Sequence, residues 1–267
     1  MAPPRLQRAR GEARIETQLR DGVTHVATLF QDGCAKVRLP HTHNSALEAV
    51  FMNTAGGLTG GDHVRWSAKA VAGTRLVVTT PACERVYKTL GGPARVENRL
   101  TVEAGAHLDW LPQETILYED GELARSLEVD LAADASFTAV ETVLLGRLAM
   151  GETAPRARLI DQWRVRCEGR LIHAEATRLS GGSSERDGLS LLAGAGAFST
   201  ILHVAPGLER KLEAVRPLLP DTGGASLVGE RLVVRLIAPS GLALRRALIP
   251  IIAVLSSAGS IPRLWSL

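Results

Sequence analysis

Apolar and polar residues alternate with a period of two through most of the first two thirds of the chain, which is the pattern of half-buried β-strands. Turn-forming pairs interrupt this alternation regularly, and Asp21-Gly22 and Asp32-Gly33 are typical of β-hairpins. Short strands at this spacing predict a mainly β fold built as a stack, sandwich or barrel. The predicted strands are residues 13–20, 23–31, 34–39, 47–52, 63–71, 75–80, 95–102, 106–111, 115–118, 127–131, 136–144, 159–167 and 171–179.

Helical patterns are concentrated in the last third of the chain. Residues 206–217 repeat leucine and valine at helical spacing and begin with a proline suited to a first turn. Ser240 can cap a second helix that continues to about residue 257 and contains Pro250. This second segment is so apolar that we expect it to pack on the β core or to be covered by a partner protein. Earlier in the chain, residues 81–88 are predicted to form one short helical turn.

A glycine-rich loop with the sequence NTAGGLTGGD, residues 53–62, follows one of the predicted strands. Glycine at this density marks turns with positive φ or the close approach of another segment. The loop lacks the Gly-Lys-Ser/Thr of a phosphate-binding loop, and it leads into a strand where a phosphate-binding loop would open a helix. We therefore interpret it as a structural or partner-facing loop. Its defining residues are Asn53, Gly56, Gly57, Gly60 and Gly61.

Composition and charge exclude several function classes. A chain of 267 residues, 45% of them hydrophobic, can bury a core, and we predict a single domain, residues 13–267, after a flexible basic tail, residues 1–12. The net charge is only +3 and aromatic residues make up 4%, so nucleic-acid binding is not expected. The sequence shows no secretory signal and no apolar run of about 20 residues, which predicts a cytoplasmic protein without membrane contact. The three cysteines form no C-x-x-C pair, as expected in a reducing compartment.

Acidic residues in apolar or glycine-rich surroundings are the most informative polar positions. A buried carboxylate needs an ion pair, hydrogen bonds or a bound cation. Ion pairs with Arg85, Arg147 or Arg178 would account for about half of this set, and hydrogen bonds or a bound cation would have to account for the rest. The six residues are Asp62, Glu84, Glu114, Glu141, Glu152 and Glu175.

Other candidates for metal chemistry are sparse. His41 and His43 can lie on one face of a strand, but two histidines make only half of a metal site. An enzymatic alternative is a metal-dependent hydrolase that uses both histidines with Asp62, and Glu84 as the general base. Cys83, beside Glu84, is either an activated thiol or a small buried hydrophobic residue, the commoner role.

Five short motifs occur in order over nearly the whole chain after the basic tail: residues 53–62 (NTAGGLTGGD), 79–88 (TTPACERVYK), 111–118 (LPQETILY), 141–152 (ETVLLGRLAMGE) and 261–265 (IPRLW). Together they resemble the UreD family of urease accessory proteins, called UreH in some systems. The resemblance implies a mainly β fold, a helix-like stack of many short strands with a few α-helices in the C-terminal third. Cys83 departs from the small residue expected in the second motif, which raises the chance of an additional soft nickel ligand.

The resemblance also implies a function. Members of this family are non-enzymatic chaperones that bind UreF and, through it, the GTPase UreG, and the complex docks on urease apoprotein to assist nickel insertion. No permanently bound cofactor is expected, only transient Ni²⁺, and carboxylates would release such a metal more readily than a closed His/Cys site. The six acidic residues are therefore predicted to form a transient nickel path, with Asp62, Glu141 and Glu152 as the first candidates. A pure scaffold through which no nickel passes is the alternative.

Partner-facing positions are predicted in two regions. Next to the glycine loop, structural or partner-facing roles are expected for Tyr87, Gly146, Arg147 and Gly151. At the C-terminal end, deletion of residues 261–267 is expected to weaken the complex with UreF. The predicted partner-binding residues in that region are Arg245, Arg246, Pro262, Arg263 and Trp265.

Overall fold

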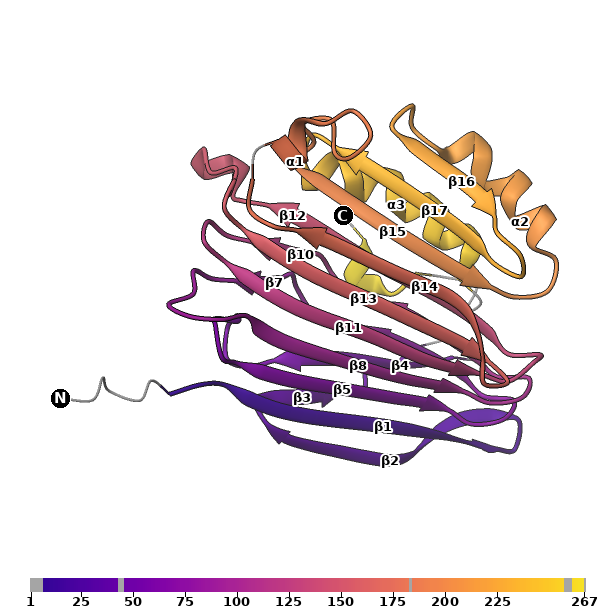
Figure 1. Ribbon diagram of the computed structural model, residues 1–267. Helices are drawn as coiled ribbons and strands as arrows, with labels where there is room; N and C mark the ends of the chain where they lie inside the picture. The colour runs from indigo at the N-terminus through magenta and orange to yellow at the C-terminus, as the bar shows by residue number, and fades with distance from the viewer. Residues whose placement is uncertain (1–6, 43–45, 183, 257–260, 267) are drawn as a thin grey trace.

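The computed structural model describes residues 7–42, 46–182, 184–256 and 261–266, and two large β-sheets dominate it (Figure 1). In spatial order the first sheet contains β14 (Arg170–Leu179), β13 (Arg158–Cys167), β11 (Glu122–Leu131), β8 (Ala94–Val102), β5 (His63–Ala70), β1 (Arg10–Arg20) and β2 (Val23–Gly33). The second contains β16 (Gly223–Leu227), β17 (Leu232–Ala238), β15 (Ala197–Val204), β12 (Ser136–Leu145), β9 (His107–Leu111), β6 (Arg75–Thr79), β4 (Leu47–Asn53) and β3 (Ala35–Arg38). Two short strands join the second sheet beside β12, namely β10 (Thr115–Leu117) and β7 (Glu84–Val86).

The chain coils between the two sheets as a β-solenoid. β4 of the second sheet is followed by β5 of the first, β6 and β7 by β8, β9 and β10 by β11, and β12 by β13, which gives about four turns within the described residues. Strands of successive turns lie parallel and in register. In Figure 1 the colour accordingly passes from indigo at one end of the stack to orange at the other. The predicted mainly β, helix-like stack is confirmed.

A column of buried aliphatic side chains runs along one corner of the solenoid. Leu58 pairs with Val86, Val86 with Leu117 and Leu117 with Leu145, and all four side chains are buried. The helical turn predicted for residues 81–88 is wrong, because Glu84–Val86 forms strand β7 of this column. Pairing with neighbouring turns overrides a weak local preference for a helix.

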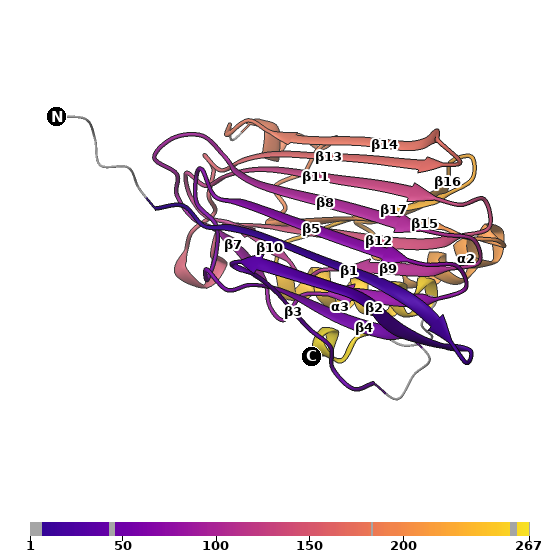
Figure 2. The same ribbon diagram turned by 90° about the horizontal axis from the view of Figure 1, so that it is seen from below.

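Both faces of the second sheet are buried. Its inner face, which includes Trp110, packs against the first sheet, whereas its outer face, which includes Val140, packs against helix α3 (Gly241–Leu255). Helix α2 (Leu208–Val215) and the 3-10 turn η3 (Arg263–Trp265) complete this outer layer (Figure 2). Strand β12 therefore has few exposed positions and little polar alternation.

Helix α3 begins where the sequence predicts, since the Ser240 hydroxyl accepts a hydrogen bond from the Ala243 amide at 3.3 Å. Pro250 lies within the helix without ending it. The buried face, which includes Leu244 and Leu248, confirms the prediction that this segment packs on the β core. None of the helices in the described ranges has the length and apolar character needed to cross a membrane.

Several elements were not predicted. Strands β15, β17 and β16 extend the second sheet beyond β12, and the short elements are α1 (Ser184–Asp187), η1 (Leu148–Met150) and η2 (Arg216–Leu218). Residues 10–12, which the sequence analysis placed in the basic tail, are the first residues of β1. The division into a tail and one domain otherwise stays a prediction.

His203 is a buried histidine on β15 that titrates abnormally. Its Nδ1 lies 3.1 Å from the Thr138 hydroxyl, and its side chain is buried in the layer between the second sheet and α3. Burial lowers the pKa of His203 to about 4, with a smaller effect of Lys211. The imidazole is therefore neutral in the native protein throughout the physiological range.

We expect His203 to make the native state sensitive to acid. In the unfolded chain histidine has a pKa of about 6.5, so the unfolded state takes up the proton first as the pH falls from about 6.5 towards 4, and the native state loses stability over that window. Relative to a His203→Gln variant, the wild-type free energy of unfolding should fall by about 2 kcal/mol between about pH 8 and pH 5. Urea denaturation of both proteins at each pH measures this difference, and a difference independent of pH would contradict a neutral, buried His203.

Candidate functional site

Four of the five sequence motifs meet at one corner of the solenoid, here termed the motif corner. Each motif supplies one residue of the buried aliphatic column, and loops about thirty residues apart in sequence consequently lie side by side, as in other repeat folds. The residues are Leu58 in the first motif, Val86 in the second, Leu117 in the third and Leu145 in the fourth.

The outer surface of the motif corner is a chain of aromatic and charged contacts. The Tyr87 hydroxyl donates a hydrogen bond to the Gly56 carbonyl at 3.2 Å, and the Tyr87 ring meets the edge of Tyr118 with centroids 5.1 Å apart. The Arg147 guanidinium lies 4.5 Å from the centre of the Tyr118 ring and forms an ion pair with Glu152. The structure thus brings together Gly56, Tyr87 and Arg147, which were predicted as loop residues from separate motifs.

Gly57 and Gly146 are glycines of these loops that have no room for a side chain. A Cβ on Gly57 (φ +142°) would lie 2.4 Å from the Tyr87 ring, and a Cβ on Gly146 (φ +77°) would lie 2.2 Å from the Glu152 carbonyl oxygen. Both positions also have a φ that side chains disfavour. Their role is to allow the loops to approach one another. The other predicted loop glycines lie in the same loops: Gly56, Gly60, Gly61 and Gly151.

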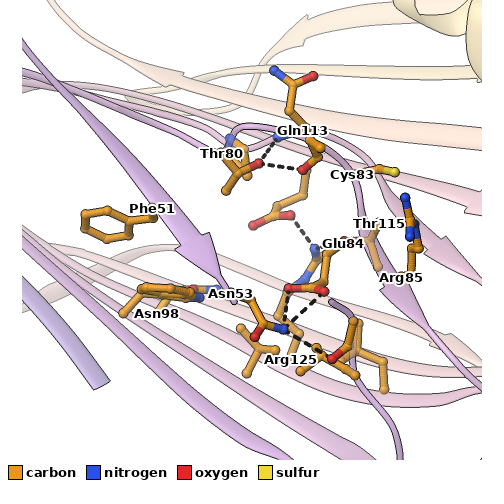
Figure 3. A pocket seen from close by; sticks show the side chains of 18 of the residues that line it. Phe51, Asn53, Thr80, Cys83, Glu84, Arg85, Asn98, Gln113, Thr115 and Arg125 are labelled. Atoms are coloured by element: carbon orange, nitrogen blue, oxygen red, sulfur yellow. Dashed lines mark hydrogen bonds and ion pairs between the residues drawn. The ribbon is translucent and has the colours of Figure 1, made fainter. Parts of the chain in front are cut away.

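A cavity of about 220 Å³ lies behind these loops (Figure 3). Glu84 of β7 lines it, and the Asn53 amide donates to both oxygens of this carboxylate, at 3.3 and 3.1 Å. Burial raises the pKa of Glu84 to about 7, although Asn53 and Arg85 act in the opposite direction. Exposed residues such as Gly56 and Arg85 also line the cavity, so it opens at the surface of the motif corner.

A buried ion network forms the inner end of the cavity. The Arg125 guanidinium donates to Asp161 through Nε at 3.1 Å and through Nη2 at 2.6 Å, and through Nη1 to Glu141 and to the Thr115 hydroxyl. The other Glu141 oxygen accepts from the Trp110 indole at 2.9 Å. Arg125 and Glu141 line the cavity, and Asp161 lies behind Arg125 on the neighbouring strand β13.

The charges of this network do not balance. Arg125 faces two carboxylates, so the network carries one excess negative charge when both are ionised. Burial raises the pKa of Glu141 to about 7, despite the opposing effects of Arg125 and Trp110, and Asp161 contributes to the rise. Burial tends to lower the pKa of Arg125, but its two carboxylate partners outweigh burial and raise it, so the guanidinium stays charged. Excess negative charge in a buried site favours the binding of a cation or a proton.

Sequence reasoning missed Arg125 and Asp161, although a signal was present. Both occupy inward-facing positions of alternating strands, where their neighbours two residues away are buried and apolar. They are also directly paired in the register of β11 and β13. A charged residue at a strand position where the alternation predicts a buried apolar residue indicates such a network.

Of the six predicted acids, only Glu84 and Glu141 line the cavity. Asp62 accepts hydrogen bonds from the backbone amides of Ala9 and Thr59, both at 2.8 Å, and thereby fixes the start of β1 to the glycine loop. Both of its oxygens are therefore used in holding the backbone.

The remaining three acids form ion pairs elsewhere. Glu114 pairs with Arg245 at 2.9 Å and Glu152 with Arg147. Glu175 pairs with Arg235 at 3.1 Å; its burial would raise the pKa, but His173 and Arg235 together lower it. Only Arg147, of the arginines predicted as partners, pairs with one of these six acids in the described part of the chain.

Comparison with known proteins identifies the family. The sequence matches the UreD urease accessory protein family over residues 9–266. It is 58% identical to a urease accessory protein UreD of Chelativorans sp. (strain BNC1), over 100% of this chain and 97% of that protein. It is 50% identical to the UreD protein of Rhizobium etli, over 98% of this chain and 97% of that protein. The chain belongs to the UreD family.

Membership of the UreD family confirms the prediction of an accessory protein in urease maturation, a chaperone and not an enzyme. The hydrolase alternative is therefore wrong. His41 is exposed after β3, and His43 lies outside the described residues. Within the described ranges, no three His, Cys, Asp or Glu side chains form a group that could hold a metal ion. Cys83 is a half-buried free thiol that lines the cavity.

The C-terminal UreD motif is anchored inside the protein. Trp265 is fully buried, and its indole donates to the Leu111 carbonyl at 3.0 Å. Arg245 donates to Gln113 at 2.6 Å and to the Leu264 carbonyl at 2.9 Å, and lies 5.0 Å from the centre of the Trp265 ring. Three of the predicted partner-binding residues therefore lie in an internal anchor: Arg245, Pro262 and Trp265. The other two are exposed: Arg246 and Arg263.

Proposed function

We propose that this UreD protein assists nickel insertion into urease apoprotein by letting Ni²⁺ pass through the cavity of the motif corner. The observation that carries the proposal is that two carboxylates from different motifs, Glu84 and Glu141, line this one cavity. The proposed path therefore retains two of the six predicted acids, and assigns the other four to holding the fold.

The chemistry of both carboxylates favours transient binding. Glu84 is held by the neutral amide of Asn53, and Glu141 shares its charge with Arg125. Because both have a pKa of about 7, protons compete with a metal ion for them near neutral pH. A single carboxylate completed by water binds Ni²⁺ far more weakly than a closed set of His and Cys ligands, so the ion is able to move on.

The predicted partners belong to the same proposal: UreF, the GTPase UreG through UreF, and urease apoprotein, in the cytoplasm. The outer surface of the motif corner is the proposed docking region, because exposed apolar side chains lie on the loops of the second and fourth motifs there. Tyr87, Leu148 and Met150 are 38%, 65% and 73% exposed. Docking over this opening would let the metal ion pass between proteins without release into bulk water.

Neutralising either carboxylate is expected to separate assembly from metal transfer. Glu84→Gln and Glu141→Gln keep the shape and remove the charge, so the complex with UreF, UreG and urease should form normally. Loss of a charged contact of about 1.5–3 kcal/mol should lower urease activation at limiting nickel by about tenfold or more. Excess nickel should restore part of the activity by mass action. Co-purification and urease activity, measured on the same samples, give the two readouts.

A matched control is Glu128→Gln, which removes an exposed carboxylate on β11 whose side chain is 55% exposed. It should assemble and activate as the wild type does. Normal activation by both cavity variants would favour the pure scaffold and contradict nickel passage. Joint loss of assembly, activation and melting temperature would show that the two carboxylates serve the fold.

A further inference from the structure

Asn98 is a buried amide whose side-chain oxygen has no partner. It lies on β8 and is 1% exposed. Its Nδ2 donates to the Ser126 carbonyl at 3.0 Å, which fixes the orientation of the amide, and its Oδ1 accepts no hydrogen bond from the described residues. A buried acceptor without a partner is costly and uncommon, and such an atom calls for a bound water or ion.

The position of Asn98 indicates where such a ligand would lie. Its neighbours in register on β5 and β11 are Trp66 and Leu127, so a polar side chain is an exception in this inward-facing row. Asn98 lines the cavity behind the motif corner (Figure 3). Glu141 lines the same cavity from the opposite sheet. An amide residue with an unpartnered oxygen and a carboxylate residue therefore line one cavity from opposite sheets.

We propose that Asn98 Oδ1 and Glu141 together form a transient binding site for a hydrated divalent cation at the inner end of the cavity. This inference rests on the proposed function. Amide and carboxylate oxygens are suitable ligands for such an ion, and two protein oxygens completed by water hold it weakly. Asn98 contributes a ligand without adding a second negative charge to the site.

The ion network permits this binding with both carboxylates still paired to a cation. Arg125 keeps two hydrogen bonds to Asp161, through Nε and Nη2, when Glu141 turns an oxygen towards the metal. The cation then compensates Glu141 in place of Arg125. Arg125 is therefore a positioning residue. It holds Glu141 while no metal is bound, and it stays paired with Asp161 when the metal takes its place at Glu141.

Nickel binding to the purified full-length chain tests the role of Asn98. Asn98→Leu removes the oxygen and should weaken Ni²⁺ binding by about tenfold, whereas Asn98→Asp replaces the amide by a carboxylate and should tighten it. Equilibrium dialysis with Ni²⁺ alone measures both, and the rise of melting temperature on adding Ni²⁺ should be smaller for Asn98→Leu than for the wild type. Gln162→Leu, which removes an exposed amide on β13, is the matched control and should bind as the wild type does.

The outcomes separate the two proposals. Weaker nickel binding by Glu141→Gln, together with wild-type binding by both Asn98 variants, would overturn the role of Asn98 and leave the proposed function intact. Wild-type binding and activation by Glu84→Gln and Glu141→Gln would overturn the proposed function itself. If Asn98→Leu does not fold, Asn98→Asp decides, and binding no tighter than wild type overturns the inference. A higher melting temperature with unchanged nickel binding in Asn98→Leu also overturns it.

Discussion

Replacing Arg125 by methionine is expected to destabilise the protein by about 3–5 kcal/mol. Methionine fills much of the same space but leaves Glu141 and Asp161 without their cation, and the side chains of these two acids are only 5% and 8% exposed. A loss of this size is comparable with the whole stability of many domains, about 5–15 kcal/mol, so little folded protein is expected at 37 °C. Urea denaturation followed by circular dichroism measures the free energy of unfolding.

Two further proteins test the electrostatic origin of this loss. Combining Arg125→Met with Glu141→Gln and Asp161→Asn removes the buried charges together and should restore a large part of the stability. Arg99→Met removes an arginine whose side chain is 67% exposed on β8, and should change stability by less than about 0.5 kcal/mol. Equal stabilities of Arg125→Met and Arg99→Met would contradict a structural role of the network.

Trp265→Ala is expected to cost about 3–5 kcal/mol, because it leaves a large cavity beneath the C-terminal end of the chain. The ring is fully buried in the outer core layer, its indole donates to the Leu111 carbonyl, and Arg245 lies over its face. The alanine variant loses the packing and leaves the carbonyl without this donor. Thermal and urea denaturation measure the loss.

The same experiment separates anchoring from partner binding at the C-terminus. Arg263→Ala and Arg246→Ala remove exposed side chains and should leave the free energy of unfolding within about 0.5 kcal/mol of the wild type. Weaker co-purification with UreF in these two variants would assign partner contact to the exposed arginines. If Trp265→Ala is as stable as the wild type, the internal anchor is not needed for folding.

Local sequence patterns predicted individual elements well where one face of an element is buried and the other is solvated. The alternation of β5, for example, is visible both in the sequence and in its burial. The patterns failed where a segment depends on distant partners. Glu84–Val86 was predicted as a helical turn, but it is extended because it pairs with Thr115–Leu117 of the next turn. Strand β17 was not predicted, although its burial alternates, because it lies in the part of the chain with helical patterns.

The candidate site was predicted in part. Glu84 and Glu141 were selected because they occur in apolar surroundings, and the structure places both in one cavity. The same criterion also selected Asp62 and Glu114, which bind backbone amides and an arginine instead. Apolar neighbours in sequence show that a carboxylate is buried, but they do not show what satisfies it.

By itself the sequence determined that the chain forms short strands separated by turns, that a capped apolar helix lies near the C-terminus, and which residues share a face within each strand. These properties depend on neighbours within a few positions, and they are visible in the sequence as a hydrophobic pattern with a period of two in strands or 3.6 in helices. Only the tertiary structure decided that the strands coil into a solenoid, so that Leu58, Val86, Leu117 and Leu145 stack. It also decided that Arg125 lies between Asp161 and Glu141. The physical reason is that pairing between strands and compensation of buried charge depend on residues far apart in the chain, which no local period specifies.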